Sequence, residues 1–421
     1  MQNTCIFAST NNLVLDKQQI MDKLFERHDD YMENVPMDFV RGLAGHIDWN
    51  LRLIAIKGPK GVGKSTLMQQ YIKQHYAPDD RHVLYCSADT SYFTSHSLVD
   101  TADMFYKRGG RYLFIDEVHK YDGWSREVKE IYDLHRDLHL VVSGSSLLQI
   151  NDGQADLSRR LVQYTMPGLS FREFLAMNRI IDVKSVSLDQ ILKAPNAFCR
   201  EVKRYCQPLE YFPRYLKEGY YPFYFENQTI YQNLVESVVN YTIETELTRF
   251  RGIEMGSCRK VKALLKVLSQ MVPYEVDISK LSKNIGIQRP TTLKYLKKLE
   301  EAALIQRLFT DVDSISDFQK PDKILLDNSN LLYTLADTAP EIGTVRETFF
   351  CNQLVSAGHK VEYGGLKSGD FRIDNDVIIE VGGKDKGFKQ IADEENAYVA
   401  ADDIDSATTH KIPLWAFGFL Y

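Results

Sequence analysis

The feature that most constrains this chain is a glycine-rich segment, Gly58–Ser65, with the sequence Gly-Pro-Lys-Gly-Val-Gly-Lys-Ser. It follows an apolar run, Leu53–Ile56, and precedes a stretch with helical spacing, Ser65–His75. Such glycines let the backbone turn its N–H groups toward a phosphate, and the start of the next helix adds partial positive charge. The segment therefore predicts a strand, a phosphate-binding loop and a helix in that order.

This loop predicts a site for ATP and Mg²⁺. We expect Lys64 to reach the β- and γ-phosphates and the Ser65 hydroxyl to ligate Mg²⁺. The alternative is a glycine-rich turn that binds no nucleotide. The residues predicted to contact the nucleotide are Gly58, Pro59, Lys60, Gly61, Val62, Gly63, Lys64, Ser65 and Thr66.

Two carboxylates, Asp116 and Glu117, follow a second apolar run, Tyr112–Ile115. In open α/β sheets, ligands bind at the carboxyl ends of the strands. Asp116 is therefore expected to hold Mg²⁺, directly or through water, and Glu117 to orient and deprotonate the attacking water. A solvated turn is the alternative interpretation.

Three further residues are candidates for the same site. Ser143 ends the next apolar run, where a polar side chain can sense the γ-phosphate or position the water. Arg159 and Arg160 precede another run, and one of them, Arg160 by preference, is a candidate to stabilise charge on the transferred phosphoryl group, in its own chain or in a neighbouring subunit. A polar turn and a solvated helix face are the alternatives for the serine and the arginines.

The spacing of apolar runs predicts the architecture of this part. Helical stretches separate the runs, which favours a parallel sheet with helices on both faces. The predicted strands are Leu53–Ile56, Val83–Cys86, Tyr112–Ile115, Leu140–Val142 and Gln163–Met166.

The rest of the chain changes in character after Pro167. A block rich in Tyr and Phe predicts a helical connecting region whose aromatic side chains pack a core. A helix, a helix–turn–helix and a hairpin then follow, which is the order of a winged helix. The last part predicts a small α+β domain with a helix at Val345–Ala357 and strands at Lys360–Tyr363, Phe371–Ile373, Val377–Val381 and Leu414–Phe419.

The predicted winged helix is basic in an acidic chain. Between Ser257 and Leu308 there are 11 Lys and Arg against 4 Asp and Glu, while the whole chain has a net charge of −6. Such a patch predicts docking of double-stranded DNA through its phosphates, although winged helices also act as lids or protein contacts. The candidate DNA contacts are Lys280, Lys283, Arg289, Lys294, Lys297 and Lys298.

Several motifs together resemble a prokaryotic AAA-type ATPase family. They are the loop above, Phe114-Ile-Asp-Glu-Val-His119, Trp124, Val142-Ser-Gly-Ser-Ser146 and Pro167-Gly-Leu-Ser-Phe-Arg-Glu-Phe174. The resemblance implies an AAA-type P-loop NTPase domain and a C-terminal domain similar to the restriction-endonuclease-like fold. The predicted divisions are an N-terminal helical segment (1–46), the ATP-binding domain (47–168), the helical connection (169–256), the winged helix (257–327) and the C-terminal domain (328–421).

The C-terminal part holds candidate metal ligands of that nuclease-like fold, Glu347, Asp370 and Glu380. Nucleases of this kind place a lysine two residues after the glutamate, where this chain has Gly382. The nearest lysine, Lys384, lies two residues further on, about 6–7 Å at the rise of a strand. We therefore favour a degenerate nuclease fold over an active one.

Composition limits the remaining choices. A 44% hydrophobic and 26% charged chain is typical of globular domains. No apolar run is long enough to span a membrane, and the first residues carry no basic start or apolar run, so neither a membrane partner nor a secretory signal is expected. The six cysteines are scattered, which predicts a reducing cytoplasm rather than a disulfide or zinc framework.

Three functions remain compatible with the sequence. The first is an ATPase whose cycle moves the winged-helix and C-terminal domains, acting on DNA or on a protein partner. The second is an ATP-regulated, Mg²⁺-dependent nuclease, as in defence against foreign DNA. The third is a nucleotide-gated interaction scaffold, and a homo-oligomer is compatible with each.

Overall fold

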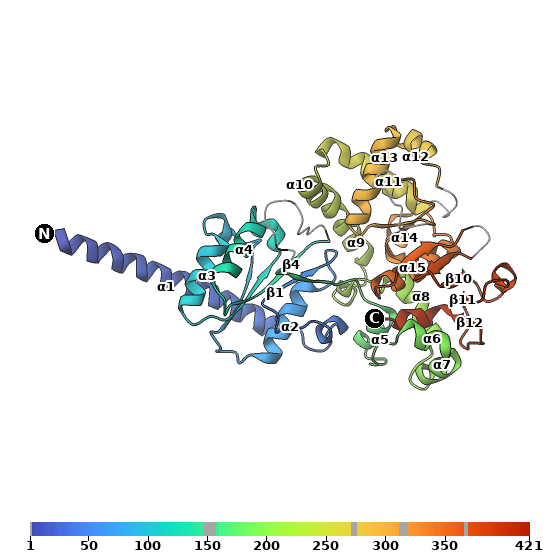
Figure 1. Ribbon diagram of the computed structural model, residues 1–421, viewed down its shortest axis with the longest axis horizontal. Coiled ribbons are helices and arrows are strands. Elements are labelled where there is room, and N and C mark those ends of the chain that lie inside the picture. The colour runs from blue at the N-terminus through green and yellow to red at the C-terminus, as the bar shows by residue number, and fades with distance from the viewer. Residues whose placement is uncertain (1, 147–156, 158, 271–275, 311–318, 366–368) are drawn as a thin grey trace. The chain divides into compact units, whose positions relative to one another are not determined.

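The computed structural model describes residues 2–146, 157, 159–270, 276–310, 319–365 and 369–421. These residues form two compact units (Figure 1). The first holds Met1–Gly58 and Gly63–Met166, and the second holds Pro59–Val62 and Pro167–Tyr421. The phosphate loop predicted from the sequence therefore has its ends in the first unit and its tip in the second.

The first unit is built on a five-stranded parallel sheet with the order β2-β3-β4-β1-β5. Parallel strands need crossover connections, so this sheet confirms the α/β class that the alternating runs predict. The strands are β1 (Leu53–Lys57), β2 (Val83–Ser87), β3 (Tyr112–Asp116), β4 (His139–Gly144) and β5 (Val162–Thr165).

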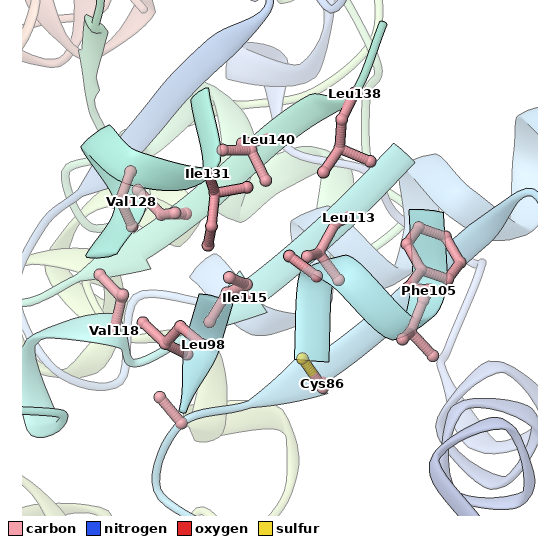
Figure 2. Packing of buried hydrophobic residues seen from close by; sticks show 14 of the residues in the cluster. Cys86, Leu98, Phe105, Leu113, Ile115, Val118, Val128, Ile131, Leu138 and Leu140 are labelled. Atoms are coloured by element: carbon pink, nitrogen blue, oxygen red, sulfur yellow. The ribbon is translucent and has the colours of Figure 1, made fainter. Parts of the chain in front are cut away.

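Helices cover both faces of this sheet. On one face, apolar side chains of α3 and α4 pack on β3 and β4 (Figure 2). On the other, Trp49 stacks on Tyr71 of α2 with ring centroids 3.8 Å apart, and both rings lie against Phe114. The helices are α1 (Gln2–Asn34), α2 (Lys64–His75), α3 (Leu98–Lys107) and α4 (Trp124–Leu134), with 3₁₀ turns at Gly42–Gly45, Ser91–Thr94 and Val118–Lys120.

Helix α1 ends earlier than the apolar spacing predicts. The sequence suggests a helical segment as far as residue 46, but α1 ends at Asn34. Pro36 explains the end, because a proline disfavours helical backbone in the residue before it and lacks an N–H. Only a short 3₁₀ turn, Gly42–Gly45, follows before β1.

The second unit begins with a helical region whose aromatic residues form a core. The Phe171 ring lies 5.2 Å from Phe212 and 5.9 Å from Phe419, so the aromatic block packs an interior as predicted. Its elements are α5 (Phe171–Met177), α6 (Leu188–Lys193), α7 (Pro195–Lys203), α8 (Pro208–Glu218), α9 (Tyr231–Tyr241) and α10 (Leu247–Arg251), with a π-helical turn at Thr242–Glu246 and 3₁₀ turns at Pro222–Phe225 and Met255–Ser257.

Three helices and a hairpin follow in the same unit. Gly286, with a φ of 68°, ends α12, and Pro290 lies in the first turn of α13, where its missing N–H costs nothing. The Ser282 and Thr292 hydroxyls, 2.7 Å apart, join the two helices. The elements are α11 (Cys258–Gln270), α12 (Ile278–Ile285), α13 (Arg289–Glu301) and the antiparallel strands β6 (Ile305–Leu308) and β7 (Lys323–Leu326).

The unit closes with two helices and a second sheet, whose order is β12-β11-β10-β9-β8. Strands β8, β9 and β10 pair antiparallel, whereas β10, β11 and β12 pair parallel. The elements are α14 (Ser329–Leu335), α15 (Ile342–Ser356), β8 (Val361–Tyr363), β9 (Phe371–Ile373), β10 (Val377–Gly382), β11 (Ala397–Ala401) and β12 (Lys411–Pro413), with a 3₁₀ turn at Lys389–Ile391.

The predicted closing strand is wrong. Leu414–Phe419 forms a 3₁₀ helix, and every residue in it is buried. A continuous apolar run has no alternation, so its sequence does not distinguish a buried strand from a buried helix. The strand at this edge of the sheet is instead the short β12 just before it.

The described residues show no covalent or metal framework. Five cysteines are free thiols, namely Cys86, Cys199, Cys206, Cys258 and Cys351, and among the described residues no three His, Cys, Asp or Glu side chains are placed to share a metal ion. Within the same part of the chain, no helix combines the length and apolar character needed to cross a membrane.

Candidate functional site

The ends of the phosphate loop are fixed by backbone geometry in the first unit. A Cβ on Gly58 would lie 2.2 Å from the carbonyl oxygen of Met166, so only glycine fits there. Gly63 has a φ of 96° directly before α2, which is the left-handed region that glycine favours. The buried Lys64 donates from Nζ to the Gly58 carbonyl at 3.0 Å. The lysine ammonium thus lies over the loop itself.

The loop tip, Pro59–Val62, belongs to the second unit. There Lys60 Nζ lies 4.2 Å from the centroid of the Tyr241 ring. Gly61 has a φ of 83°, and a Cβ on it would lie 2.8 Å from the Phe223 ring. Both the backbone conformation and the close ring therefore require glycine at this position.

Asp116, at the end of β3, is buried and held from the two neighbouring strands. The Tyr85 hydroxyl on β2 donates to its Oδ2 at 2.7 Å. The Ser143 hydroxyl on β4 donates to its Oδ1. Burial, followed by the charge of Asp116, raises the pKa of Tyr85 well above its usual value, so this phenol stays a donor. These contacts fix the carboxylate at the carboxyl edge of the sheet.

Glu117 follows with a strained backbone and a partly exposed carboxylate. Its φ is 52°, in the left-handed region that non-glycine residues seldom adopt. Its N–H lies 3.0 Å from both Asp116 Oδ1 and Ser143 Oγ, which holds this conformation. Its Oε2 lies 3.4 Å from Nε2 of the buried His119. The side chain is therefore both oriented and accessible.

The phosphate loop and the carboxylates lie at the same sheet edge. Strand β1 pairs with β4 so that Ile56 lies opposite Ser143, and Gly58 follows two residues later. The glycine cradle at Gly58 and Gly63 fits a phosphate chain, and the Ser65 hydroxyl and Asp116 carboxylate are the hard oxygen donors that Mg²⁺ prefers. These residues thus fit ATP and Mg²⁺.

The two candidate arginines lie elsewhere in the first unit. Arg160 pairs through Nε with Asp133 Oδ1 at 3.1 Å, close to the end of α4. Arg160 comes just before β5, whose first residue pairs with Ile54 at the start of β1. Arg159 and Arg160 are therefore at the amino edge of the sheet, opposite the phosphate loop. The structure contradicts a role for either arginine at its own chain's phosphates.

The basic residues of α12 and α13 differ in exposure. Lys280, Lys283, Arg289 and Lys294 are exposed, and Lys297 is half-buried. Lys298 is buried and donates from Nζ to the Arg251 carbonyl. Burial lowers its pKa, and the nearby Lys294 adds to that effect. Lys298 is thus a structural residue, which corrects its assignment as a DNA contact.

The C-terminal candidates come together except for the predicted lysine. Glu347, Asp370 and Glu380 belong to one charged cluster with Lys323. Lys384 instead lies 3.8 Å from Asp403, with both side chains exposed. The lysine that pairs with Glu380 is Lys386. The lysine assignment from the sequence is therefore corrected.

Sequence reasoning missed Tyr85 and His119 in the first unit. Tyr85 lies in an apolar run that reads as a buried strand, and only the pairing of β2 with β3 brings its hydroxyl to Asp116. His119 stands in the motif Phe114–His119, two residues beyond Glu117, but nothing in the spacing predicts that its ring turns back. Strand order and a local 3₁₀ turn decide both placements.

Two family models match separate parts of the chain. Residues 50–175 match the model of an AAA domain. The matched segment contains the phosphate loop and both carboxylates. Together with the site geometry, this match supports a nucleotide-binding ATPase domain. Residues 209–340 match a domain of unknown function (DUF8612), which spans α8 to α14.

Curated relatives do not add a function. One uncharacterised protein of Methanocaldococcus jannaschii is 25% identical over 317 residues, covering 72% of this chain and 63% of that protein. A second, from the same organism, is 21% identical over 265 residues, covering 60% and 56%. The chain therefore spans about three-fifths of the length of these relatives.

Two solved structures show a weak likeness to this chain. The structure of PCH-2 from C. elegans is 16% identical, with a TM-score of 0.23, and the match covers 38% of this chain and 44% of that one. A katanin structure, from work on katanin self-assembly, is 15% identical, also with a TM-score of 0.23, and the match covers 33% and 48%. These scores are too low to support an argument.

Proposed function

We propose that this chain hydrolyses ATP with Mg²⁺ and couples its nucleotide state to its winged-helix and C-terminal parts. The observation that carries the proposal is the placement of Asp116, Ser143 and Glu117 at the sheet edge where the phosphate loop begins. A loop that only stored nucleotide would not need a second, partly exposed carboxylate held in a strained conformation. That feature favours hydrolysis over simple binding.

Each residue then has a defined task. Lys64 leaves the Gly58 carbonyl to bind the β- and γ-phosphates, and Ser65 and Asp116 are the residues that would hold Mg²⁺. When bound, the ion neutralises charge on the phosphates. Glu117 orients a water and accepts its proton. The Ser143 hydroxyl holds both the Glu117 N–H and the Asp116 carboxylate in place. His119 orients the Glu117 carboxylate.

Replacement of the loop lysine tests nucleotide binding. Lys64→Ala removes the cation expected at the phosphates, so affinity for a fluorescent ATP analogue should fall at least about tenfold. Lys107→Ala is the matched control, since Lys107 lies at the end of α3 and pairs with the Asp103 carboxylate. Equal affinity in the wild type and Lys64→Ala would contradict the proposed site.

The exposed cations of α12 and α13 support DNA docking as part of this function. Lys280, Lys283 and Lys294 are exposed on the helix–turn–helix, where they can neutralise phosphates. Reversing all three to glutamate should abolish retention of a double-stranded DNA fragment at low salt, because counterion release supplies the binding free energy.

The control for this test is a set of basic residues outside the two helices. Lys184, Lys193 and Lys217 lie in the helical region, and their reversal should leave DNA retention unchanged. DNA retention that survives reversal on α12 and α13 would remove DNA from the proposal and leave a protein contact for these helices.

A nucleotide-gated interaction scaffold is an alternative function that can be distinguished from hydrolysis. In a nucleotide-gated scaffold, ATP binding matters more than turnover, so Glu117→Gln should leave the cellular activity of the protein intact. Loss of that activity in Glu117→Gln would exclude the scaffold.

Arg159 or Arg160 can complete the site only from a neighbouring subunit, so size-exclusion chromatography should show an ATP-dependent oligomer. Elution as a monomer both with and without ATP would exclude that role.

A further inference from the structure

Tyr85, whose hydroxyl donates to Asp116, is itself held by a helix that precedes the sheet in sequence. Its backbone N–H donates to Nδ1 of His28 on α1 at 2.9 Å, and its ring centroid lies 5.1 Å from that of Tyr31, edge to face. Both His28 and Tyr85 are buried, so their hydrogen bond is shielded from water. Helix α1 and the carboxylate of the ATP site therefore contact the same tyrosine.

The place of β2 in the sheet explains why a helix holds Tyr85. Strand β2 lies at the edge, so in the described part of the chain the N–H groups on its outer side face no further strand. Nδ1 of His28 is the acceptor for one of these groups. Burial lowers the pKa of His28 to about 4, so the imidazole is neutral at pH 7 and Nδ1 can accept this hydrogen bond.

The alternation of side chains along β2 directs the Tyr85 hydroxyl toward the site. Leu84 and Cys86, on either side of it, belong to the apolar cluster that α3 and α4 cover, so the Tyr85 ring points to the opposite face of the sheet. Ser87, two residues along on that face, pairs with Asp116. The phenol therefore reaches diagonally across two strands, and Asp116 Oδ2 accepts its hydrogen bond at 2.7 Å.

Helix α1 also holds the residues just before β2. Arg81 donates from its two terminal nitrogens to Asp29 of α1, at 2.7 and 2.9 Å, and its guanidinium carbon lies 4.8 Å from the centroid of the Phe25 ring. Both charged side chains are exposed, so the ion pair adds little free energy, but its two-pronged geometry favours one position of α1 along β2. A displacement of α1 would therefore move β2 and the Tyr85 hydroxyl with it.

We propose that Tyr85 is a positioning residue for the carboxylate expected to hold Mg²⁺, and that α1, through His28, sets where Tyr85 lies. The Tyr85 hydroxyl donates to one oxygen of Asp116 and the Ser143 hydroxyl to the other, so the carboxylate keeps one orientation. Groups that orient a metal ligand in this way tune metal affinity. The inference rests on the proposed ATP and Mg²⁺ site, and it makes α1 the element whose position alters the Mg²⁺ requirement of that site.

The Mg²⁺ dependence of nucleotide binding tests the role of Tyr85. A fluorescent ATP analogue at a fixed low concentration is mixed with the full-length chain and titrated with Mg²⁺. Tyr85→Phe removes only the hydroxyl, so the half-saturating Mg²⁺ concentration should rise roughly tenfold or more, while analogue affinity in EDTA stays unchanged. Tyr121→Phe is the matched control, because that phenol donates to the Glu127 carboxylate at 2.8 Å, and its loss should leave the Mg²⁺ requirement unchanged.

Substitution of His28 tests the role of α1. His28→Ala removes the acceptor for the Tyr85 N–H, so it should also raise the half-saturating Mg²⁺ concentration. His28→Asn, whose amide oxygen can take the place of Nδ1, should recover most of the loss. Because α1 acts through the Tyr85 hydroxyl, His28→Ala should add less than about twofold in a Tyr85→Phe background. Circular dichroism checks that each variant is folded.

The outcomes separate this inference from the proposed function. Absence of Mg²⁺-dependent analogue binding in the wild type would overturn both of them. Mg²⁺-dependent binding with the same half-saturating concentration in wild type and Tyr85→Phe would overturn the inference and leave the ATP site standing. An effect of His28→Ala that is equally large with and without the Tyr85 hydroxyl would overturn the role of α1.

Discussion

At the scale of single residues, the proposed hydrolysis depends on how Glu117 is held. A left-handed conformation costs a non-glycine residue about 1–3 kcal/mol, and it persists where surrounding contacts enforce it. Here the contacts are two hydrogen bonds from its N–H, to Asp116 and Ser143. The Glu117 Oε2 lies 3.4 Å from Nε2 of the buried His119, which places this imidazole where it can orient the carboxylate.

Removal of His119 should therefore slow turnover without weakening nucleotide binding. His119→Ala frees the Glu117 carboxylate to rotate, and small misplacement of a catalytic group costs roughly ten- to a hundredfold in rate. Steady-state phosphate release measures kcat and KM separately. His119→Gln, which keeps a polar donor, should recover part of the loss. A fall in ATP affinity with kcat unchanged would show that His119 acts in some other way.

At the scale of elements, one buried carboxylate joins three parts of the second unit. Asp327, at the end of β7, accepts from Gln306 of β6 at 2.7 Å. Its Oδ2 lies 3.3 Å from the Tyr220 hydroxyl, after α8, and 3.3 Å from the Asn328 amide, before α14. Burial raises the pKa of Asp327 to about 6, although these hydrogen bonds oppose the shift.

This shift predicts a pH-dependent stability. Because the folded-state pKa is raised above 3.8, the folded chain binds the proton more tightly, and stability falls as pH rises from about 4 to about 6. The shift corresponds to about 3 kcal/mol. The difference in unfolding free energy between wild type and Asp327→Asn should change by about that amount between pH 4 and pH 7.5. Denaturant unfolding measures both proteins across this pH range. Curves of unfolding free energy against pH that run parallel for the two proteins would contradict the prediction.

The sequence predicts elements well where their pattern is periodic. The alternating runs of the first unit predict its parallel sheet, and Gly58–Ser65 predicts the strand, loop and helix around it. The pattern fails at Leu414–Phe419, where both sides are buried, and after Asn34, where one proline outweighs the apolar spacing. The contacts of Tyr85 and Lys386 depend on strand pairing and on a missing Cβ, which local sequence does not encode.

At the scale of the whole molecule, the chain combines two units that share one loop. The first unit carries the carboxylates and the start of α2, while residues 59–62 belong to the second.

The most direct measurement of the central claim compares ATP binding and phosphate release in wild type and Glu117→Gln. The glutamine keeps the size of the side chain but cannot accept the proton of the attacking water. We predict unchanged binding of a fluorescent ATP analogue and a loss of turnover of about a hundredfold or more. Equal turnover in the two proteins, with binding intact, would contradict the assignment of this sheet edge as a hydrolytic site.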